Sequence, residues 1–352
     1  MALTRRGTIA AGAATAALLA AGATAYFTLF PQNAPAFVRT TLETVGLAEE
    51  PPPPPPICPL TGEEATAGKL PHRPALAIKI ENHPDARPQA ALNLADVIYE
   101  EPVEGGYTRF IAVFHCESSD RVGPVRSGRT TDPDVLRQFG PAVFGYAGAV
   151  GAVKREVPRA GLVDVNYLNA ADAYVRDGAR AAPHDLYTTT TALWKAAASE
   201  AGAPDPIFTY AESYEGKARR TAGVRLPFST VADVVWTWSK REGAWLRAHG
   251  EIAHELEDGS PVSATSVVIQ LVDVTASQIL DAAGNPSPDV GLTGSGKAYV
   301  LRDGKVIVGR WERASLDDLT RFVTKDGAEI PLAPGRTWVE LLPSTVVVEF
   351  LR

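Results

Sequence analysis

One stretch of the sequence, residues 100–129, brings together the side chains most suited to chemistry. Its charged members of interest are Glu100, Glu101, Glu104, Arg109, Arg121, Arg126 and Arg129. Several guanidiniums beside Gly-Pro and Ser-Gly suit bidentate contact with a carboxylate or a phosphate. The stretch therefore predicts a site for an anionic ligand, although a set of structural ion pairs would explain the same charges.

Two further side chains could take part in catalysis. An imidazole before a helix start, as at His184, could act as a general base or contact a ligand, or it could simply bond to the backbone of a turn. Ser127 could be a nucleophile if His184 and an acid such as Asp185 or Glu101 lay within hydrogen-bond reach. The sequence has no GxSxG motif, so a serine hydrolase is the less favoured reading.

A β-hairpin is expected to position the first of these residues. The runs at 96–103 and 107–115 are rich in β-branched and aromatic residues and are separated by a Gly-Gly pair, which is typical of a tight hairpin turn. A three-residue loop at 104–106 would place Glu101 opposite Arg109 as a cross-strand ion pair. A two-residue loop would shift the register and bring Glu100 opposite Ile111.

Metal, nucleotide and nucleic-acid sites find no support in the sequence. His83 and His115 lie near the hairpin, but neither HxxxH nor HxH spacing occurs, so we expect no metal site. There is no GxGxxG after a strand and no P-loop, and we expect no cofactor. The net charge of −7 argues against binding to nucleic acid.

The two cysteines, Cys58 and Cys116, are too few for a zinc site made of cysteines alone. In an oxidising compartment they could pair, and the disulfide would join the start of the folded body to the end of the hairpin. The sequence does not give their separation, so two free thiols remain the alternative.

The N-terminus predicts a location at the membrane. Arg5 and Arg6 precede an uncharged run at residues 9–30, long enough to span a bilayer, with the positive flank on the cytoplasmic side. We favour a single-pass signal anchor with an extracytoplasmic body; a cleaved signal peptide and a secreted protein are the alternative. Six prolines at 51–56 then predict a stiff spacer.

The remaining sequence predicts an α+β protein with two domains. Strand and helix signals alternate in the first half, which indicates a mixed α/β domain, whereas the second half is predominantly strand-like and predicts an antiparallel β domain. The expected segments are a signal anchor or signal peptide at 1–30, a Pro-rich linker at 31–57, an α/β domain at 58–205, a linker at 206–223 and a β-rich domain at 224–352. The tryptophans of the second half are expected to pack in the core.

The chain contains the long motifs RVGPVRSGR, APHDLYTT and GSGKAYVLRDGKVIVGRWER. These motifs resemble those of the YerB-like lipoprotein family, which is catalogued as a domain of unknown function in Gram-positive bacteria. The resemblance implies an envelope location and a two-part body, and it supports His184 as a site residue, but it brings no reaction. Many relatives are lipoproteins; here no cysteine closes the apolar run, so we favour the anchor over lipidation.

These observations leave three hypotheses for function. The favoured one is an extracytoplasmic protein that binds an anionic envelope ligand, such as a cell-wall polymer or peptide; the others are a wall-active hydrolase or transferase using Glu100, Glu101 or Glu104 with His184, and a scaffold for envelope proteins. A deep cleft joining carboxylates and His184 would favour the enzyme, and an arginine patch would favour binding. The expected ligand-binding residues are Arg109, Arg121, Arg126, Ser127, Arg129, His184, Asp185 and Tyr187.

Overall fold

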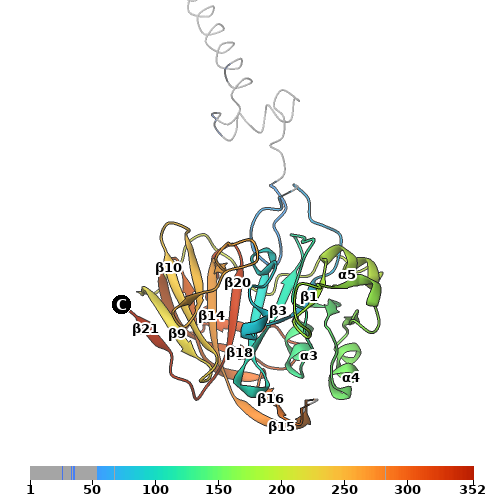
Figure 1. The fold of residues 1–352 in the computed structure, drawn as a ribbon. Helices are drawn as coiled ribbons and strands as arrows, with labels where there is room; N and C mark the ends of the chain where they lie inside the picture. Colours follow the sequence, from blue (N-terminus) through green and yellow to red (C-terminus); the bar gives the residue numbers. More distant parts are fainter. Residues whose placement is uncertain (1–25, 27–32, 34, 36–53, 67, 282) are drawn as a thin grey trace, which may run out of the picture. The chain divides into compact units, whose positions relative to one another are not determined.

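The structure, a computed structural model, describes Tyr26, Asn33, Pro35 and residues 54–66, 68–281 and 283–352. Pro55–Arg352 forms one compact unit (Figure 1). Apart from Tyr26, the predicted anchor at 9–30 lies outside the described residues, as does most of the linker at 31–57. Among the residues that are described, no helix has the length and apolar character of a membrane span.

The N-terminal half contributes five strands to a large sheet. They are β1 (Leu76–Glu81), β2 (Val97–Pro102), β3 (Thr108–Phe114), β4 (Val143–Gly145) and β5 (Val163–Asp164). β2 and β3 form the predicted hairpin, with Glu101 opposite Arg109. Its turn holds Gly105 and Gly106 at φ of 71° and 77°, a backbone region that residues with a Cβ rarely adopt. The predicted three-residue loop and its register are therefore confirmed.

The C-terminal half extends the same sheet. Its members are β8 (Arg219–Arg220), β14 (Ser266–Val272), β17 (Gly294–Arg302), β18 (Lys305–Arg313), β19 (Arg321–Val323) and β20 (Thr337–Pro343). The order of this 11-stranded sheet is β19-β18-β17-β14-β20-β2-β3-β1-β4-β5, with β8 paired to β18. Because β20 pairs in parallel with both β14 and β2, one sheet runs through both halves of the chain.

A second, six-stranded sheet packs on one face of the first (Figure 1). It consists of β9 (Gly223–Pro227), β10 (Asp233–Ser239), β11 (Ala244–His249), β12 (Ile252–Ala253), β13 (Ser263–Ala264) and β21 (Glu349–Leu351). Between the sheets, the rings of Trp236 and Trp338 meet at a centroid distance of 5.2 Å. Trp236, Trp245, Trp311 and Trp338 are buried, and Trp238 is partly exposed, so most of the tryptophans serve packing as expected.

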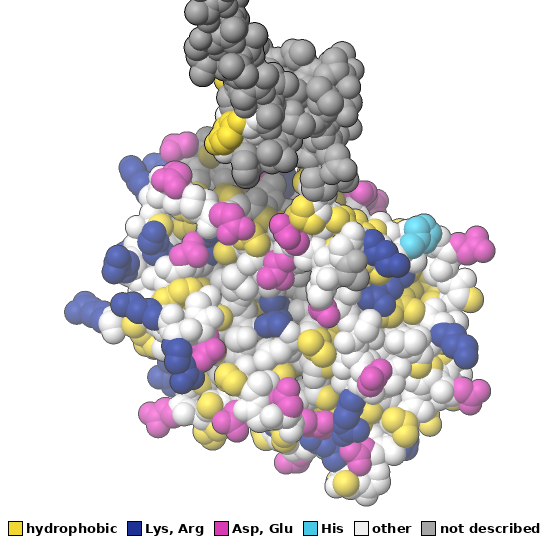
Figure 2. Space-filling view, turned by 90° about the horizontal axis from the view of Figure 1, so that it is seen from above, with side chains coloured by type: hydrophobic (Ala, Val, Ile, Leu, Met, Phe, Trp, Pro, Cys, Tyr) yellow, Lys and Arg dark blue, Asp and Glu magenta, His cyan; other side chains and the backbone are white. Residues whose placement is uncertain are grey.

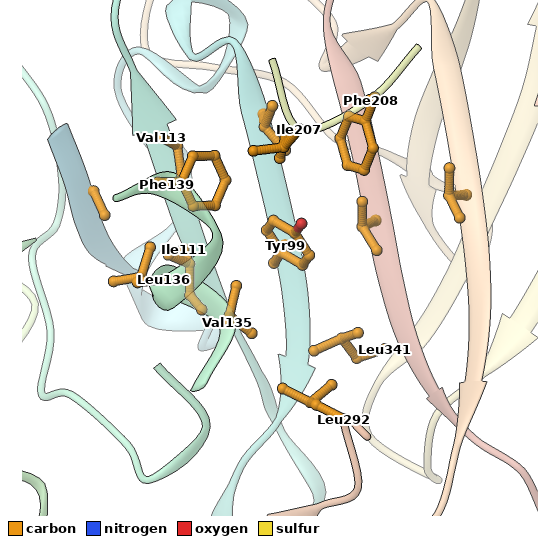
Figure 3. Close-up of a cluster of buried hydrophobic side chains, with 14 of the residues drawn as sticks. Tyr99, Ile111, Val113, Val135, Leu136, Phe139, Ile207, Phe208, Leu292 and Leu341 are labelled. Carbon is orange, nitrogen blue, oxygen red and sulfur yellow. The ribbon is translucent and has the colours of Figure 1, made fainter. Parts of the chain in front are cut away.

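Short helices cover the N-terminal strands. α3 (Thr131–Leu136) and α4 (Gly151–Arg159) pack in one apolar cluster with Tyr99 and Ile111. Figure 3 shows part of this cluster, including the α3 side chains. α5 (Thr190–Ala197) contacts β1 and β4 and belongs to the apolar cluster of the opposite face. Thr189 caps α5, since its side chain accepts a hydrogen bond of 2.9 Å from the Ala192 amide.

The fold is richer in strands than the sequence indicated. The body is sheet-rich and contains both helices and strands, but the three α-helices described are short and do not form the layer of an α/β domain. The C-terminal half is not purely antiparallel, because β14 and β20 run parallel. Asp132 lies inside α3, and its carboxylate bonds to Lys79 and to the Arg129 amide.

Two ribbons and a disulfide complete the body. The ribbons are β6 (Tyr174–Arg176) with β7 (Leu186–Thr188), and β15 (Val274–Leu280) with β16 (Pro286–Val290). The sulfurs of Cys58 and Cys116 are bonded, with 6.2 Å between their Cα atoms. The bond joins the segment that enters the body to the end of β3.

Candidate functional site

Alternation along β2 sends Glu100 and Glu101 to opposite faces of the large sheet. Glu100 lies between the two sheets, where Arg247 Nη2 donates to both carboxylate oxygens at 2.9 and 2.8 Å. Glu340 lies opposite Glu100 on β20, and its pKa is raised well above the ordinary value by burial and then by the charge of Glu100. These three side chains are at most 2% exposed, so the cluster joins the sheets and is out of reach of a ligand.

Glu101 belongs to a buried cluster of three charges on the other face. Lys79 Nζ donates to Glu101 and, at 2.6 Å, to Asp132 Oδ1. The second oxygen of Asp132 accepts the Arg129 amide at 2.6 Å. The cluster therefore fixes the backbone of the arginine loop, residues 126–129, against β1 and β2.

Glu81 at the end of β1 holds two of the predicted arginines. Its carboxylate accepts hydrogen bonds from Arg126 Nε and, at 3.4 Å, from Arg109 Nε. Burial alone would raise the pKa of Glu81, but the two guanidiniums outweigh it and hold the pKa below its ordinary value. The predicted ion pair between Glu101 and Arg109 was wrong: β1 flanks β3 and offers Glu81 to Arg109, while Lys79 takes Glu101.

Glu104, in the hairpin turn, orients the third arginine. Arg129 Nε donates to Glu104 Oε2 at 2.7 Å, and Ser287 on β16 donates to Oε1 at 2.5 Å. Burial opposes ionisation of Glu104, but the Ser287 hydroxyl and the Arg129 guanidinium hold its pKa below the ordinary value. Arg129 is thus fixed between the hairpin turn and the loop that precedes α3.

These side chains border a cavity of about 420 Å³, here called the arginine cavity. Its lining comprises Glu104, Arg109, Arg126, Ser127, Gly128, Arg129, Gly148, Ala149, Val150, Asp281, Ala283 and Ser287. The side chains of Arg126, Arg129 and Arg109 are 26%, 14% and 9% exposed. Within the described residues, neither Nη atom of Arg126 bonds to the protein, and Nη2 of Arg109 and of Arg129 is also unbonded.

The free Nη donors of these arginines, more than the net charge, suit the cavity to an anion. Each arginine is anchored to a carboxylate through Nε, which leaves Nη donors for another partner. Asp281 in the lining offsets part of the positive charge. The arrangement can therefore grip one carboxylate or phosphate group by its oxygens, and does not collect anions by charge alone.

Three predicted site residues lie in other networks. Arg121 bonds Glu257 Oε2 at 2.6 Å through Nε and stacks on Tyr187, 3.7 Å from the ring centre. The Tyr187 hydroxyl donates to Glu257 Oε1 at 2.8 Å, and Asp185 accepts from Arg176 at 2.7 Å. Arg121 and Tyr187 therefore tie the N-terminal half to a loop of the C-terminal half, and the arginine cavity is formed without them.

His184 lies beside the cavity but does not line it. Its Nδ1 is 3.8 Å from Glu81 Oε2 and has no hydrogen-bond partner in the described residues. Burial lowers the pKa of His184, which favours the neutral imidazole. The structure places it next to β1 and does not bring it into hydrogen-bond contact with Glu100, Glu101 or Glu104.

His184 also belongs to a group that could offer ligands to a metal ion. Its ring stacks on His83 at 5.2 Å, and ligand atoms of His83, Asp85 and His184 lie within 4.8 Å of one another. Sequence spacing did not predict this group, because His83 and His184 come from distant segments. Glu81, the carboxylate near His184, is already bonded to two arginines, so it is not free to complete a metal site.

Sequence reasoning identified part of the site and missed its supports. Arg109, Arg126, Ser127 and Arg129 do meet in one cavity. Lys79, Glu81 and Asp132 were not predicted, although two charges alternating with apolar residues at the end of a buried strand were a usable signal for the first two. No sequence signal could have placed Ser287, which reaches the cavity from a distant ribbon.

Two family models match the sequence of this sheet-rich body. "Protein of unknown function (DUF3048) N-terminal domain" matches residues 60–203, and the corresponding C-terminal domain matches residues 224–339. The chain belongs to this family, and the resemblance seen in its motifs is confirmed. Residues 204–223 separate the two models in the sequence, whereas the large sheet continues across both.

A curated relative and a solved structure extend the similarity over most of the chain. The Bacillus subtilis (strain 168) protein called "Putative lipoprotein YerB" is 31% identical over 299 residues, or 81% of this chain and 86% of the relative. The crystal structure of YerB protein from Bacillus subtilis matches with a TM-score of 0.72 at 26% identity, covering 84% of this chain and 99% of that one.

Proposed function

We propose that this protein is an uncharacterised cell-envelope protein that binds an anionic ligand in the arginine cavity. The observation that carries the proposal is the free Nη donors of Arg109, Arg126 and Arg129, which border one cavity while their Nε atoms are held by carboxylates. A carboxylate or phosphate can accept two parallel hydrogen bonds from such a fork.

The surrounding structure supports a site that is formed before the ligand arrives. The buried Lys79, Glu101 and Asp132 hold the loop that carries Arg126 and Arg129. Holding the guanidiniums in place lowers the conformational entropy that binding removes. A patch that served only solubility would have no need for a buried charge cluster beneath it.

The ligand class follows from the expected location. The uncharged run at 9–30 behind Arg5 and Arg6 suits a single-pass anchor with an extracytoplasmic body, and the relative from Bacillus subtilis is named as a lipoprotein. A ligand in that compartment with carboxylate or phosphate groups is a cell-wall peptide or an anionic wall polymer.

The proposal is tested by replacing Arg126, the most exposed of the three arginines, with lysine. Arg126→Lys keeps the charge but removes the fork, so affinity for purified wall fragments should fall by about 1.5–3 kcal/mol. The melting temperature should change little. Binding is measured by isothermal titration calorimetry at two salt concentrations.

A matched control is Arg121→Lys, which makes the same chemical change outside the cavity. This variant should bind as the wild type does. Equal affinities of the wild type and Arg126→Lys, or no binding by either, would remove the cavity as the ligand site.

An enzyme acting on the wall has less support. It would need a glutamate of the hairpin and His184 at one substrate. Glu100 and Glu101 are buried on opposite faces of the sheet, and His184 is in hydrogen-bond contact with none of the three glutamates. The scaffold hypothesis gains nothing from the arginine cavity.

A further inference from the structure

A second, larger cavity lies on the C-terminal half, and it shares no residue with the arginine cavity. It measures about 850 Å³ and lies where β8, β10, the turn between β17 and β18, and β21 come together. We call it the basic groove, after four of its basic side chains, Arg219, Arg220, Lys240 and Lys305; Trp238, Phe350 and Arg352 also line it. Figure 2 shows Lys and Arg side chains on the side of the molecule that carries β10 and β21.

These four cations have no acidic partner. None of their side chains forms an ion pair or a hydrogen bond with any described residue, and all four are exposed. The carboxylate in the lining, Asp303, is bonded to Arg302 at 2.8 Å. In a chain with a net charge of −7, this local excess of positive charge is unusual.

Two of the cations are placed against each other. Arg220 on β8 lies directly opposite Lys305 on β18 in an antiparallel pair. Like charges at directly opposite positions destabilise a sheet. The arrangement lowers the stability of the free protein, and an anion bound between the two side chains would relieve the repulsion.

Aromatic rings supply an apolar floor beside these charges. The Arg219 guanidinium lies 4.7 Å from the ring centre of Phe350, and Trp238 is partly exposed and packs against the backbone of Gly304. The volume is within the range of sites that take a small organic ligand or a segment of a polymer. Such a site suits a ligand that alternates anionic groups with carbon-bearing units.

We propose that the basic groove binds a polyol-phosphate chain, with successive phosphates on the unpaired cations and the polyol units against Trp238 and Phe350. Lysine and arginine both bind phosphate, the former as a point charge and the latter as a fork. The cations come from β8, from the residue that follows β10 and from the start of β18, so a chain with several phosphates can reach all of them. The proposal stands independently of the arginine cavity.

The concave shape argues for a soluble chain and against a bilayer. A flexible chain can enter the groove and follow it from one cation to the next, whereas a flat layer of headgroups cannot enter it. Nucleic acid is disfavoured by the negative net charge of the protein, which repels a long polyanion beyond the groove.

The test uses a synthetic oligomer of glycerol phosphate and the double variant Arg220→Gln, Lys305→Gln. The oligomer should bind the wild type, and the double variant should bind at least tenfold more weakly. Because the repulsion is removed, the melting temperature of the double variant should stay the same or rise. A clear fall in melting temperature would show that the pair holds the fold together, and would overturn the proposal.

The control is Lys154→Gln, Arg155→Gln on α4, where two exposed cations lie outside both cavities. It makes the same change in net charge and should retain affinity within twofold. Equal losses in both double variants would mean that net charge alone attracts the oligomer. Tighter binding to phosphatidylglycerol vesicles or to oligothymidylate than to the oligomer would assign the groove to a membrane or to nucleic acid instead.

Discussion

At the scale of single residues, one buried cluster of this protein combines two carboxylates with a single ammonium group. Lys79 lies between Glu101 and Asp132, all with side chains 0% exposed. Two carboxylates and one ammonium leave an excess negative charge in a medium where burial disfavours ionised acids. One proton shared within the cluster removes that excess.

Glu101 is the group that takes the proton. Burial raises the pKa of Glu101 from 4.5 to about 7, and the Asp132 charge adds to this effect against the attraction of Lys79. Between these two values the folded protein holds a proton that the unfolded chain has released. The stabilisation is therefore complete below pH 4.5 and is lost as pH rises through about 7.

The variant Glu101→Gln should flatten this dependence. Over the same range, the unfolding free energy of the wild type should fall with a slope that includes up to about 1.4 kcal/mol per pH unit from Glu101. The variant keeps Lys79 paired with Asp132 and loses that part of the slope. Urea unfolding at several pH values measures it; parallel curves for the two proteins would place the shared proton elsewhere.

Asp96 contributes a pH dependence of stability that should be the same in the wild type and in Glu101→Gln. Its pKa is also raised by burial, to about 7, against the opposing amides of His115 and Cys116. It titrates in the same direction and is unchanged by the substitution. The variant should therefore retain a shallower slope of the same sign, and a curve that became steeper would contradict the assignment.

The sequence predicted that the arginine loop belongs to a site, but it did not predict which residues the loop contacts. The period of two along a strand already implies that Glu100 and Glu101 face opposite ways, and the structure has them so. That Arg109 meets Glu81 depends on β1 lying beside β3, which is a matter of strand order. Local sequence carries little information about strand order, so the ion-pair prediction failed while the register prediction held.

At the scale of elements, the sequence predicted the hairpin, which has a strong local turn signal, and did not predict strands whose local pattern is weak. The hairpin follows from the glycines of its turn, which allow the positive φ that a tight turn needs. β9 and β11 were not foreseen, because their apolar residues alternate with arginine, histidine and glycine and their pairing is supplied by β10. Tertiary pairing outweighs intrinsic propensity in such strands.

The disulfide joins two elements that are far apart in sequence. Cys58 and Cys116 are separated by 58 residues. In the chain-entropy model, a loop of this length stabilises the folded state by up to about 4 kcal/mol. The double variant Cys58→Ser, Cys116→Ser should lower the free energy of unfolding by about 2–4 kcal/mol.

Guanidinium unfolding of the oxidised wild type and of the double variant measures the effect. Reducing the wild type with dithiothreitol should bring its midpoint to that of the double variant, which serves as the control. Superimposed curves for oxidised wild type and double variant would show that the bond adds nothing to the stability of the body.

At the scale of the whole molecule, one sheet unites two segments that the sequence presents as separate. β20 lies between β14 and β2 and pairs in parallel with each. Arg247 of the second sheet bonds Glu100 of β2 in the buried space between the sheets. A body built this way depends on both segments for its central strands and for the partners of its buried charges.

The two halves should therefore not fold separately. A fragment of residues 55–205 would lose β20 and expose β2, of which all residues but the last are buried, as a sheet edge, and Glu100 would lose Arg247. An exposed apolar edge aggregates, and an unpaired buried charge is strongly destabilising. Each fragment, 55–205 or 206–352, should lack a cooperative unfolding transition, whereas 55–352 should show one.

Cleavage of the folded chain tests whether the shared sheet holds the two halves together when the chain between them is cut. A protease site placed after Gly216, in the exposed segment that precedes β8, should be cut without loss of the native near-ultraviolet circular dichroism, and both pieces should elute together in gel filtration. The same two pieces, expressed together, should assemble to that state. If fragment 55–205 alone unfolded cooperatively with a native-like near-ultraviolet spectrum, the shared sheet would not be what holds the halves together.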